Sequence, residues 1–323
     1  MPYHFCTYFD RNYLYKGLAL YRSLESHCAS FRLWVLCLDE VTRNILRSLQ
    51  LPNVVLVGLD EFEAANPRLL EVKPSRTTVE YYWTLTPSWC LYLLERDKDI
   101  EIITYLDADL FFFSDIAPIF EELGDKSIAI IEHRFAPAYA HNLETAGIYN
   151  VSLVTFRREE EGLDCLRRWR DQCIDWCFFR HEAGKLGDQM YLNDWPSKYS
   201  GVQVLQHVGA GVAPWNIGRY TLTRRNGQLF LDTQPLIFYH FHQFSPITSF
   251  MFELAGRGYR FARYQVAWVY RPYMAAIRQS IREVNRKDAP FHYGYASRHW
   301  RELVRSFCDG RLYFTPDPRL WLI

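Results

Sequence analysis

Two carboxylates stand two positions apart directly after a hydrophobic run in this chain. The run covers residues 100–106 and leads into Asp107, Ala108 and Asp109. In an extended segment alternate side chains point to the same side, so the two carboxylates share one face. Carboxylates held this close repel each other unless a cation lies between them, and their hard oxygen atoms suit Mg²⁺ or Mn²⁺. A solvated turn after a strand, where Asp is common, is the alternative interpretation.

A pair of histidines ends a late hydrophobic segment, residues 236–241. His240 and His242 are two positions apart, so an extended backbone places both rings on one face. Imidazole is a good ligand for Mn²⁺-like ions, and a strand can hold it rigidly. The sequence therefore offers either histidine as a further metal ligand, with a pair of half-buried core histidines as the alternative.

Two short polar segments offer groups that could contact a nucleotide or a sugar. Gly187 precedes Asp188 and Gln189, and glycine lets the backbone turn sharply before a helical segment. Asp10 follows the first hydrophobic run, and Tyr13 could lie against a nucleobase while the carboxylate contacts polar edges. Both aspartates could instead cap the helices that follow them.

The elements that must position these residues alternate along the chain. Hydrophobic runs predict strands, and periodic apolar positions predict helices between them. Such alternation predicts an α/β fold with a mostly parallel sheet covered on both faces, which binds ligands beyond the carboxyl ends of its strands. The predicted strands are residues 3–9, 31–38, 53–59, 100–106, 127–131, 151–156 and 236–241. The predicted helices are residues 12–26, 42–51, 159–179 and 186–195, and a further helix begins at Pro87 after an irregular stretch, residues 62–87.

Composition narrows the classes of protein that the chain can represent. Lys plus Arg and Asp plus Glu both number 37, so there is no bulk electrostatic attraction to nucleic acid. Aromatic residues make up 17%, and their flat rings suit nucleobases and sugar faces. Eight cysteines in mostly apolar surroundings predict buried free thiols, and no segment reads as a signal peptide or a membrane span. These features predict a cytoplasmic protein.

The character of the sequence changes near residue 250. Residues 1–250 carry the motifs above and are expected to form the main domain, whereas residues 251–323 are rich in Arg and Tyr, with few acids. We expect a helical C-terminal appendage. It could lie on an anionic membrane at the inner face, where lipid-linked acceptors are found, or serve as a brace or dimer contact.

Taken in this order, the motifs resemble glycosyltransferase family 8 and its bacterial relatives in the nucleotide-diphospho-sugar transferase superfamily. The resemblance covers residues 3–243 and implies the GT-A fold, a Rossmann-like arrangement. Asp10 to Tyr13 look like the D-x-N-Y of the family, Asp107 and Asp109 like its D-x-D, and Asn150 like its donor-contacting Asn. Asp188 and Gln189, followed by Leu192 and Asn193, look like its D-Q-x-x-L-N.

The resemblance implies a role for each matching residue. Donor binding falls to Tyr8, Asp10, Asn12, Tyr13 and Asn150. The metal, Mn²⁺ or Mg²⁺, falls to Asp107, Asp109, and His240 or His242. Asp188 and Gln189 would line the anomeric centre of the sugar.

The sequence also departs from the family pattern. The family has a Lys on the diphosphate soon after its metal-binding His, but His240 is followed by FHQFSP. Arg76 is the candidate for the basic group that replaces it. His207 begins a glycine-rich run that imitates the family's His motif and is an alternative metal ligand. Residues 74–88 match nothing in the family, which indicates a distinct bacterial subfamily.

The resulting hypothesis is a metal-dependent glycosyltransferase. A UDP-sugar would donate to a hydroxyl of a saccharide, a lipid-linked saccharide or a protein, with retention at the anomeric carbon, in polysaccharide biosynthesis. Glu132, His133, Trp215 and Asn216 are acceptor-side candidates. Two alternatives are a sugar nucleotidyltransferase, for which residues 5–13 lack the expected glycine-rich basic loop, and a non-catalytic carbohydrate-binding module.

Overall fold

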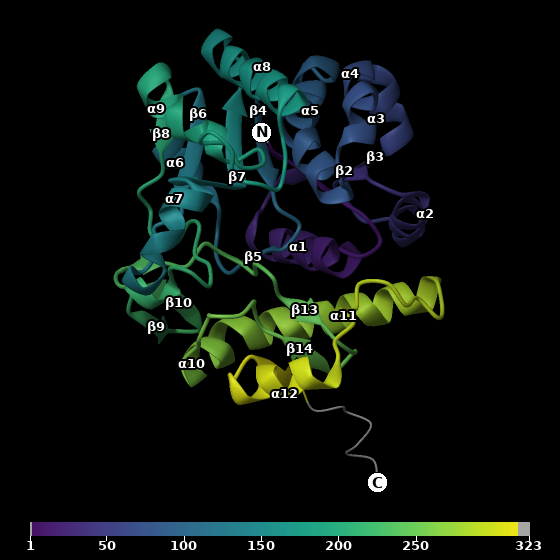
Figure 1. Ribbon diagram of the computed structural model, residues 1–323, viewed down its shortest axis with the longest axis vertical. Coiled ribbons are helices and arrows are strands. Elements are labelled where there is room, and N and C mark those ends of the chain that lie inside the picture. The colour runs from purple at the N-terminus through teal and green to yellow at the C-terminus, as the bar shows by residue number, and fades with distance from the viewer. Residues whose placement is uncertain (1, 316–323) are drawn as a thin grey trace.

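The computed structural model describes residues 2–315 and has a seven-stranded sheet at its centre (Figure 1). The strand order is β3-β2-β1-β4-β7-β6-β8, and β7 alone runs against its neighbours. The mostly parallel α/β sheet expected from the sequence is therefore confirmed. The strands are β1 Tyr3–Phe9, β2 Phe31–Cys37, β3 Val54–Gly58, β4 Ile102–Leu106, β6 Ile128–Glu132, β7 Tyr149–Arg157 and β8 Val202–Val204.

Helices cover both faces of this sheet. Side chains alternate across a strand, so Phe5 belongs to the hydrophobic cluster beneath α1 and Cys6 to the cluster beneath α5 and α8. In Figure 1 α5 and α8 lie on one side of the sheet and α1 on the other. The helices of this part are α1 Leu14–His27, α2 Glu40–Leu49, α3 Leu59–Ala65, α4 Pro67–Val72, α5 Thr78–Arg96, α6 Ala117–Leu123, α7 Leu143–Ala146, α8 Glu160–Asp175 and α9 Trp195–Lys198. Short 3₁₀ turns are η1 Lys73–Ser75, η2 Pro137–Asn142, η3 Met190–Asp194 and η4 Ile217–Arg219.

The expected helix start at Pro87 is wrong, because α5 begins nine residues earlier and contains this proline. Thr77 and Glu80 form a reciprocal capping box that fixes the true start at Thr78. The helix is buried on most of its circumference, so its apolar residues show no single stripe from which the sequence pattern could place it. This correction matters because α5 supplies several residues of the site described below.

Smaller sheets complete the fold beyond the central one. β5 Leu110–Phe112 pairs with β12 Phe238–His240, which joins the segment after β4 to a segment far along the chain. The other short strands are β9 Leu222–Arg225, β10 Gln228–Leu231, β11 Gln234–Pro235, β13 Ser245–Pro246, β14 Met251–Glu253 and β15 Leu312–Phe314.

The C-terminal part packs against α1. It contains α10 Arg263–Gln265, the π-helical turn η5 Val266–Tyr270, α11 Arg271–Lys287 and α12 Trp300–Cys308. Met274 and Ile277 of α11 lie in the same hydrophobic cluster as Leu14 and Leu18 of α1, and Figure 1 shows α11 alongside α1.

Two further expectations concern the cysteines and the membrane. Seven of the eight cysteines are buried and unpaired, as expected, while Cys308 is exposed. None of the helices between residues 2 and 315 has the length and apolar character needed to cross a membrane.

Candidate metal and nucleotide site

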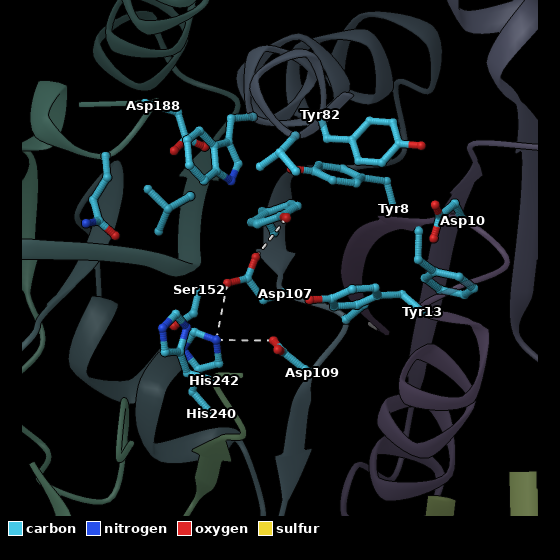
Figure 2. Close-up of a pocket in the computed structure, with 18 of the residues that line it drawn as sticks. Tyr8, Asp10, Tyr13, Tyr82, Asp107, Asp109, Ser152, Asp188, His240 and His242 are labelled. Carbon is cyan, nitrogen blue, oxygen red and sulfur yellow. Dashed lines mark hydrogen bonds and ion pairs between the residues drawn. The ribbon is translucent and has the colours of Figure 1, made fainter. Parts of the chain in front are cut away.

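A cavity of about 660 Å³ opens at the carboxyl edge of β1 and β4 (Figure 2). Of the residues proposed from the sequence to bind the donor, the sugar or the metal, the structure brings all to this cavity except Arg76 and the alternative ligand His207. The residues in its lining are Tyr8, Asp10, Asn12, Tyr13, Asp107, Asp109, Asn150, Asp188, Gln189, His240 and His242. Asn150 reaches this edge because β7 runs antiparallel, so its first residues meet the last residues of β4. Parallel sheets bind ligands at this edge.

Strand pairing places His240 against the two aspartates. In the β5–β12 pair His240 lies opposite Leu110, and the amide of Phe241 donates to the carbonyl of Asp109. His240 Nε2 then lies 3.1 Å from Asp109 Oδ1 and 3.7 Å from Asp107 Oδ2. Figure 2 shows both carboxylates directed toward this ring.

These three residues have the chemistry of a divalent-cation site. One potential ligand atom from each lies within 4.8 Å of the others. Two carboxylates and an imidazole form a donor set that suits Mn²⁺. Asp109 and His240 are buried, and Asp107 faces the cavity with its side chain 31% exposed, so a bound ion would be reachable by a ligand in the cavity.

Burial and the neighbouring charges shift the pKa values of the three cluster residues in different directions. Burial raises the pKa of Asp107 to about 6, assisted by Asp109 and opposed by His240. Burial also opposes ionisation of Asp109, but His240 and Lys16 outweigh it and keep the pKa of Asp109 below its usual value. The pKa of His240 is raised because Asp109 outweighs the effect of burial. Without an ion, His240 and Asp109 share a proton, and a bound ion would displace that proton.

His242 lines the cavity but lies outside the three-residue cluster. Its ring packs edge-on against His240 and against Trp215, with centroid distances of 5.6 and 5.3 Å. Burial and then the neighbouring His240 lower the pKa of His242 to about 4, so the ring is neutral at neutral pH. The alternative ligand His207 does not line the cavity, and its Nδ1 accepts from the amide of Gly209.

Asp188 is held by α5 rather than acting as a helix cap. Thr86 donates to Asp188 Oδ2 at 3.1 Å, and the hydroxyl of Tyr8 lies 2.9 Å from Thr86 Oγ1. The expected sharp turn is present, because Gly187 has a φ of 54°. Burial, and then the charge of Asp107, raise the pKa of Asp188 to about 7. The carboxylate thus lies in the cavity wall with one hydroxyl donor.

Gln189 is fixed at both ends of its amide. Asn150 Nδ2 donates to Gln189 Oε1 at 3.1 Å, and Gln189 Nε2 donates to the carbonyl of Ala146 at 2.6 Å. Asn150 in turn accepts at Oδ1 from the amide of Ser152. These bonds orient two amide side chains toward the cavity beside Asp188.

The segment after β1 forms a tight turn instead of a side-chain helix cap. Asp10 accepts from the backbone and side-chain amides of Asn12, both at 2.9 Å, while the N-cap position of α1 is Tyr13. Tyr13 is 43% exposed, and in Figure 2 it lies with Asp10, Tyr8 and Tyr82 on the side of the cavity away from His240. The polar edges of Asp10 and the aromatic rings together form a place suited to a nucleoside.

Arg76, proposed as the basic group for the diphosphate, does not line the cavity. Its guanidinium lies 3.8 Å from the ring centroid of Phe178 and donates to the carbonyl of Ile174. A lysine that the sequence interpretation missed, Lys16 of α1, lies close to the cluster instead, with Nζ 3.7 Å from Asp109 Oδ2. The available signal was a single charged residue within an otherwise apolar helical stretch, residues 14–20.

The acceptor-side candidates lie behind the cavity lining. Trp215 Nε1 and Asn216 Nδ2 both donate to the carbonyl of His133, at 2.9 and 2.8 Å. His133 Nδ1 bonds to the carbonyl of Gly147. Neither these three residues nor Glu132 belongs to the cavity lining. They brace the loops around His240, and Trp215 packs edge-on against its ring.

Other lining residues carry aromatic rings that the sequence interpretation did not assign. Tyr82 and Trp83 come from α5, and Phe179 follows α8. Trp83 and Phe179 pack edge to face with centroids 5.4 Å apart. The dense aromatic content of residues 74–88 was the feature of the sequence that could have indicated Tyr82 and Trp83.

Two solved structures that share this architecture are of a glycosyltransferase. The galactosyltransferase LgtC, solved with donor and acceptor sugar analogues, covers 85% of this chain and 95% of its own length, with a TM-score of 0.51 and 16% identity. An active-site glutamine-to-glutamate mutant of LgtC covers 87% and 99%, with a TM-score of 0.52 and 16% identity. At this identity the likeness shows the GT-A glycosyltransferase fold.

Sequence comparison identifies nearer relatives. No family model matches the chain. YfnF of Bacillus subtilis (strain 168) is 30% identical over 301 residues, which cover 91% of this chain and 97% of the relative. YfnD of the same organism is 33% identical over 300 residues, covering 92% and 96%. The chain therefore belongs to the family of Bacillus subtilis YfnD and YfnF.

Proposed function

We propose that the chain is a metal-dependent glycosyltransferase that moves a sugar from a nucleoside diphosphate sugar, a UDP-sugar in the first instance, to a hydroxyl. The observation that carries this proposal is the Asp107, Asp109 and His240 cluster in the wall of a cavity of about 660 Å³. The shared fold with LgtC and the order of family 8-like motifs support it. The cavity volume suits a ligand of nucleotide-sugar size.

The cluster would hold Mn²⁺ or Mg²⁺. Such an ion supplies Lewis acidity to a diphosphate that leaves a sugar. The chain's own part is to hold the nucleoside on the other side of the cavity, where Tyr8, Tyr13 and Tyr82 offer ring faces and Asp10 an acceptor. The anomeric carbon would then lie between the cluster and Asp188.

Asp188 and Gln189 are the groups suited to orient the sugar. An anionic Asp188 opposite the anomeric carbon would stabilise the positive charge that develops as the diphosphate leaves. The amide of Gln189 is too constrained by Asn150 and Ala146 to move far, so it would contact the ring rather than attack it. We infer retention by front-face attack of the acceptor hydroxyl, with the leaving phosphate as base.

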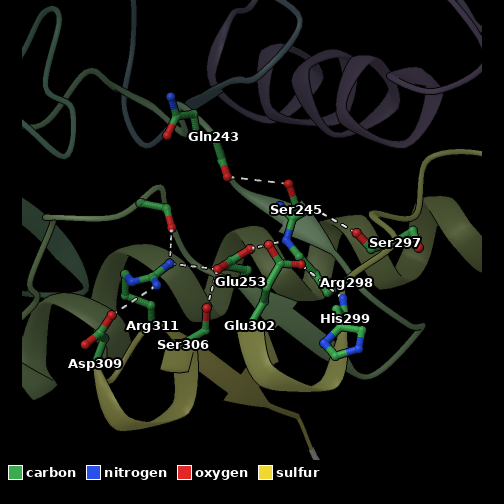
Figure 3. A network of polar contacts seen from close by, with 11 residues as sticks. Gln243, Ser245, Glu253, Ser297, Arg298, His299, Glu302, Ser306, Asp309 and Arg311 are labelled. Carbon is green, nitrogen blue, oxygen red and sulfur yellow. Dashed lines mark hydrogen bonds and ion pairs between the residues drawn. The ribbon is translucent and has the colours of Figure 1, made fainter. Parts of the chain in front are cut away.

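The acceptor partner is proposed to be a saccharide that is presented at a membrane. Residues 251–323 hold 13 Lys and Arg against 6 Asp and Glu, in a chain whose net charge is zero. Figure 3 shows Arg298, Ser306 and Arg311 around Glu253, whose carboxylate accepts from all three, so Ser306 of α12 faces inward. The opposite face of α12 exposes an apolar stripe, defined here as Trp300, Val304 and Phe307, which are 61%, 54% and 64% exposed. Exposed aromatics in a basic surround suit an anionic bilayer.

We expect the chain to float with vesicles that contain phosphatidylglycerol and to stay in solution with pure phosphatidylcholine. Replacing the three residues of the apolar stripe by Ser should abolish flotation, because each side chain contributes its buried area to the interface. Leu70→Ser, at an exposed apolar residue of α4, is the matched control and should float as the wild type does. Equal flotation of the stripe variant would contradict the proposed contact.

A donor-consumption assay tests the proposed function itself. The chain is incubated with a panel of nucleotide sugars and Mn²⁺, and release of the nucleoside diphosphate is followed by mass spectrometry. We expect one donor to be consumed with Mn²⁺ and to be spared with EDTA. Donor consumption that EDTA does not reduce would refute the metal-dependent reaction.

A further inference from the structure

Lys16 is buried beside the metal cluster without belonging to the cavity lining. It is 6% exposed, and its Nζ lies 3.7 Å from Asp109 Oδ2 and 4.0 Å from the ring centroid of Tyr13. Asp109 and Tyr13 do line the cavity. The ammonium group therefore lies directly behind two lining residues. Little water separates it from the cavity, so its charge is only weakly screened there.

The formal charges near the cluster explain why this position matters. Ionised Asp107 and Asp109 carry two negative charges, and the positive charge of Lys16 brings the sum of these three charges to minus one. A divalent cation is attracted by the carboxylates and repelled by Lys16. A nucleoside diphosphate, which is strongly anionic, is repelled by the carboxylates and attracted by both Lys16 and the cation.

We propose that Lys16 couples metal binding to diphosphate binding, by weakening the affinity for the metal alone and strengthening the affinity for the metal together with the nucleotide. This inference rests on the proposed function. Lys16 acts through its charge on Asp109 and the cavity, and we class it as a positioning residue, since it does not line the cavity. Its effect is a coupling free energy between two ligands, which is reciprocal.

The test is a pair of calorimetric titrations of the purified chain with Lys16→Met. Mn²⁺ alone should bind about tenfold more tightly than to the wild type, because a positive charge has been removed. UDP in saturating Mn²⁺ should bind about tenfold more weakly, because the positive charge that attracts its anionic diphosphate has been removed. Lys98→Met, at an exposed lysine between α5 and β4, is the control and should change neither affinity.

The opposite signs separate coupling from a merely structural role. A Lys16 that only props Asp109 in place would, when removed, weaken both Mn²⁺ and UDP, and that result would overturn the inference. Unchanged affinities would overturn it as well. If the methionine variant has a lowered melting temperature, Lys16→Gln is tested as well. This variant also removes the charge and should show the same two changes in affinity. Failure of the wild-type chain to bind Mn²⁺ or UDP would contradict the proposed function itself.

Discussion

Asp109→Asn is expected to reduce metal-dependent donor consumption by about a thousandfold. Asp109 is the buried carboxylate whose oxygen lies 3.1 Å from His240 Nε2 and whose pKa stays below its usual value despite burial. An amide of the same shape keeps the packing but is a far weaker ligand for a hard cation. Steady-state rates with saturating Mn²⁺ and donor measure the loss.

Two controls separate lost chemistry from lost structure. The substitution leaves His240 and Lys16 without their charged partner, so the melting temperature should fall, and circular dichroism at the assay temperature must show a folded chain. Asp125→Asn, at an exposed position between α6 and β6, should retain full activity. A folded Asp109→Asn variant with more than a tenth of the wild-type rate would contradict the assignment.

The second large effect is expected from Asp188→Asn, which should lower the rate about a hundredfold while leaving UDP affinity unchanged. Asp188 has one side-chain donor, Thr86, and an asparagine can keep that bond through its carbonyl oxygen. The variant loses the negative charge that faces the developing cationic carbon, so the loss should appear in kcat rather than in binding. Asp175→Asn, at the exposed end of α8, is the control.

The same substitution should stabilise the metal-free chain above neutral pH. Burial raises the pKa of Asp188 from 3.8 to about 7, so the folded state binds this proton more tightly than the unfolded state. The contribution of Asp188 to the free energy of unfolding is therefore greatest below pH 4, and it is lost as the pH rises toward 7. Asp188→Asn removes that loss and should add about 4 kcal/mol to the free energy of unfolding at pH 8. Denaturant titrations in EDTA at pH 4 and pH 8 measure the difference, and an equal effect at both values would contradict it.

The elements of the central sheet could be predicted because their patterns are local. β1 has the bounds that its hydrophobic run predicted, and β2, β3, β4, β6 and β7 begin and end within about two residues of prediction, whereas the short edge strand β8 was not predicted. The reversed direction of β7 could not be predicted in this way, since parallel and antiparallel buried strands have the same apolar pattern. That reversal is what brings Asn150 to the site.

The residues of the candidate metal cluster could be predicted from the sequence, but their geometry could not. The spacing of Asp107 and Asp109 predicted a shared face, whereas the partner histidine depended on the register between β5 and β12. The order of the segments favoured His240 or His242 over His207 but did not choose between the first two. The register selects His240 as the ring that lies among the carboxylates.

Basic residues were the least predictable part of the site. Arg76 was proposed from its position in the sequence, yet its guanidinium packs on the ring of Phe178 and donates to the carbonyl of Ile174. Lys16 lies in a stretch of α1 in which every residue from Leu14 to Tyr21 is buried, and a lysine in such a stretch usually indicates only a long side chain that reaches solvent. Its position beside Asp109 is a tertiary contact, which the local pattern of the helix does not reveal.

The most direct test of the account is a crystal structure of the chain with Mn²⁺ and UDP, with diffraction recorded at the manganese absorption edge. We expect one anomalous peak bound by Asp107, Asp109 and His240, with the diphosphate of UDP on the same ion. A metal bound elsewhere, or UDP held in the cavity with no ion at these three residues, would contradict it.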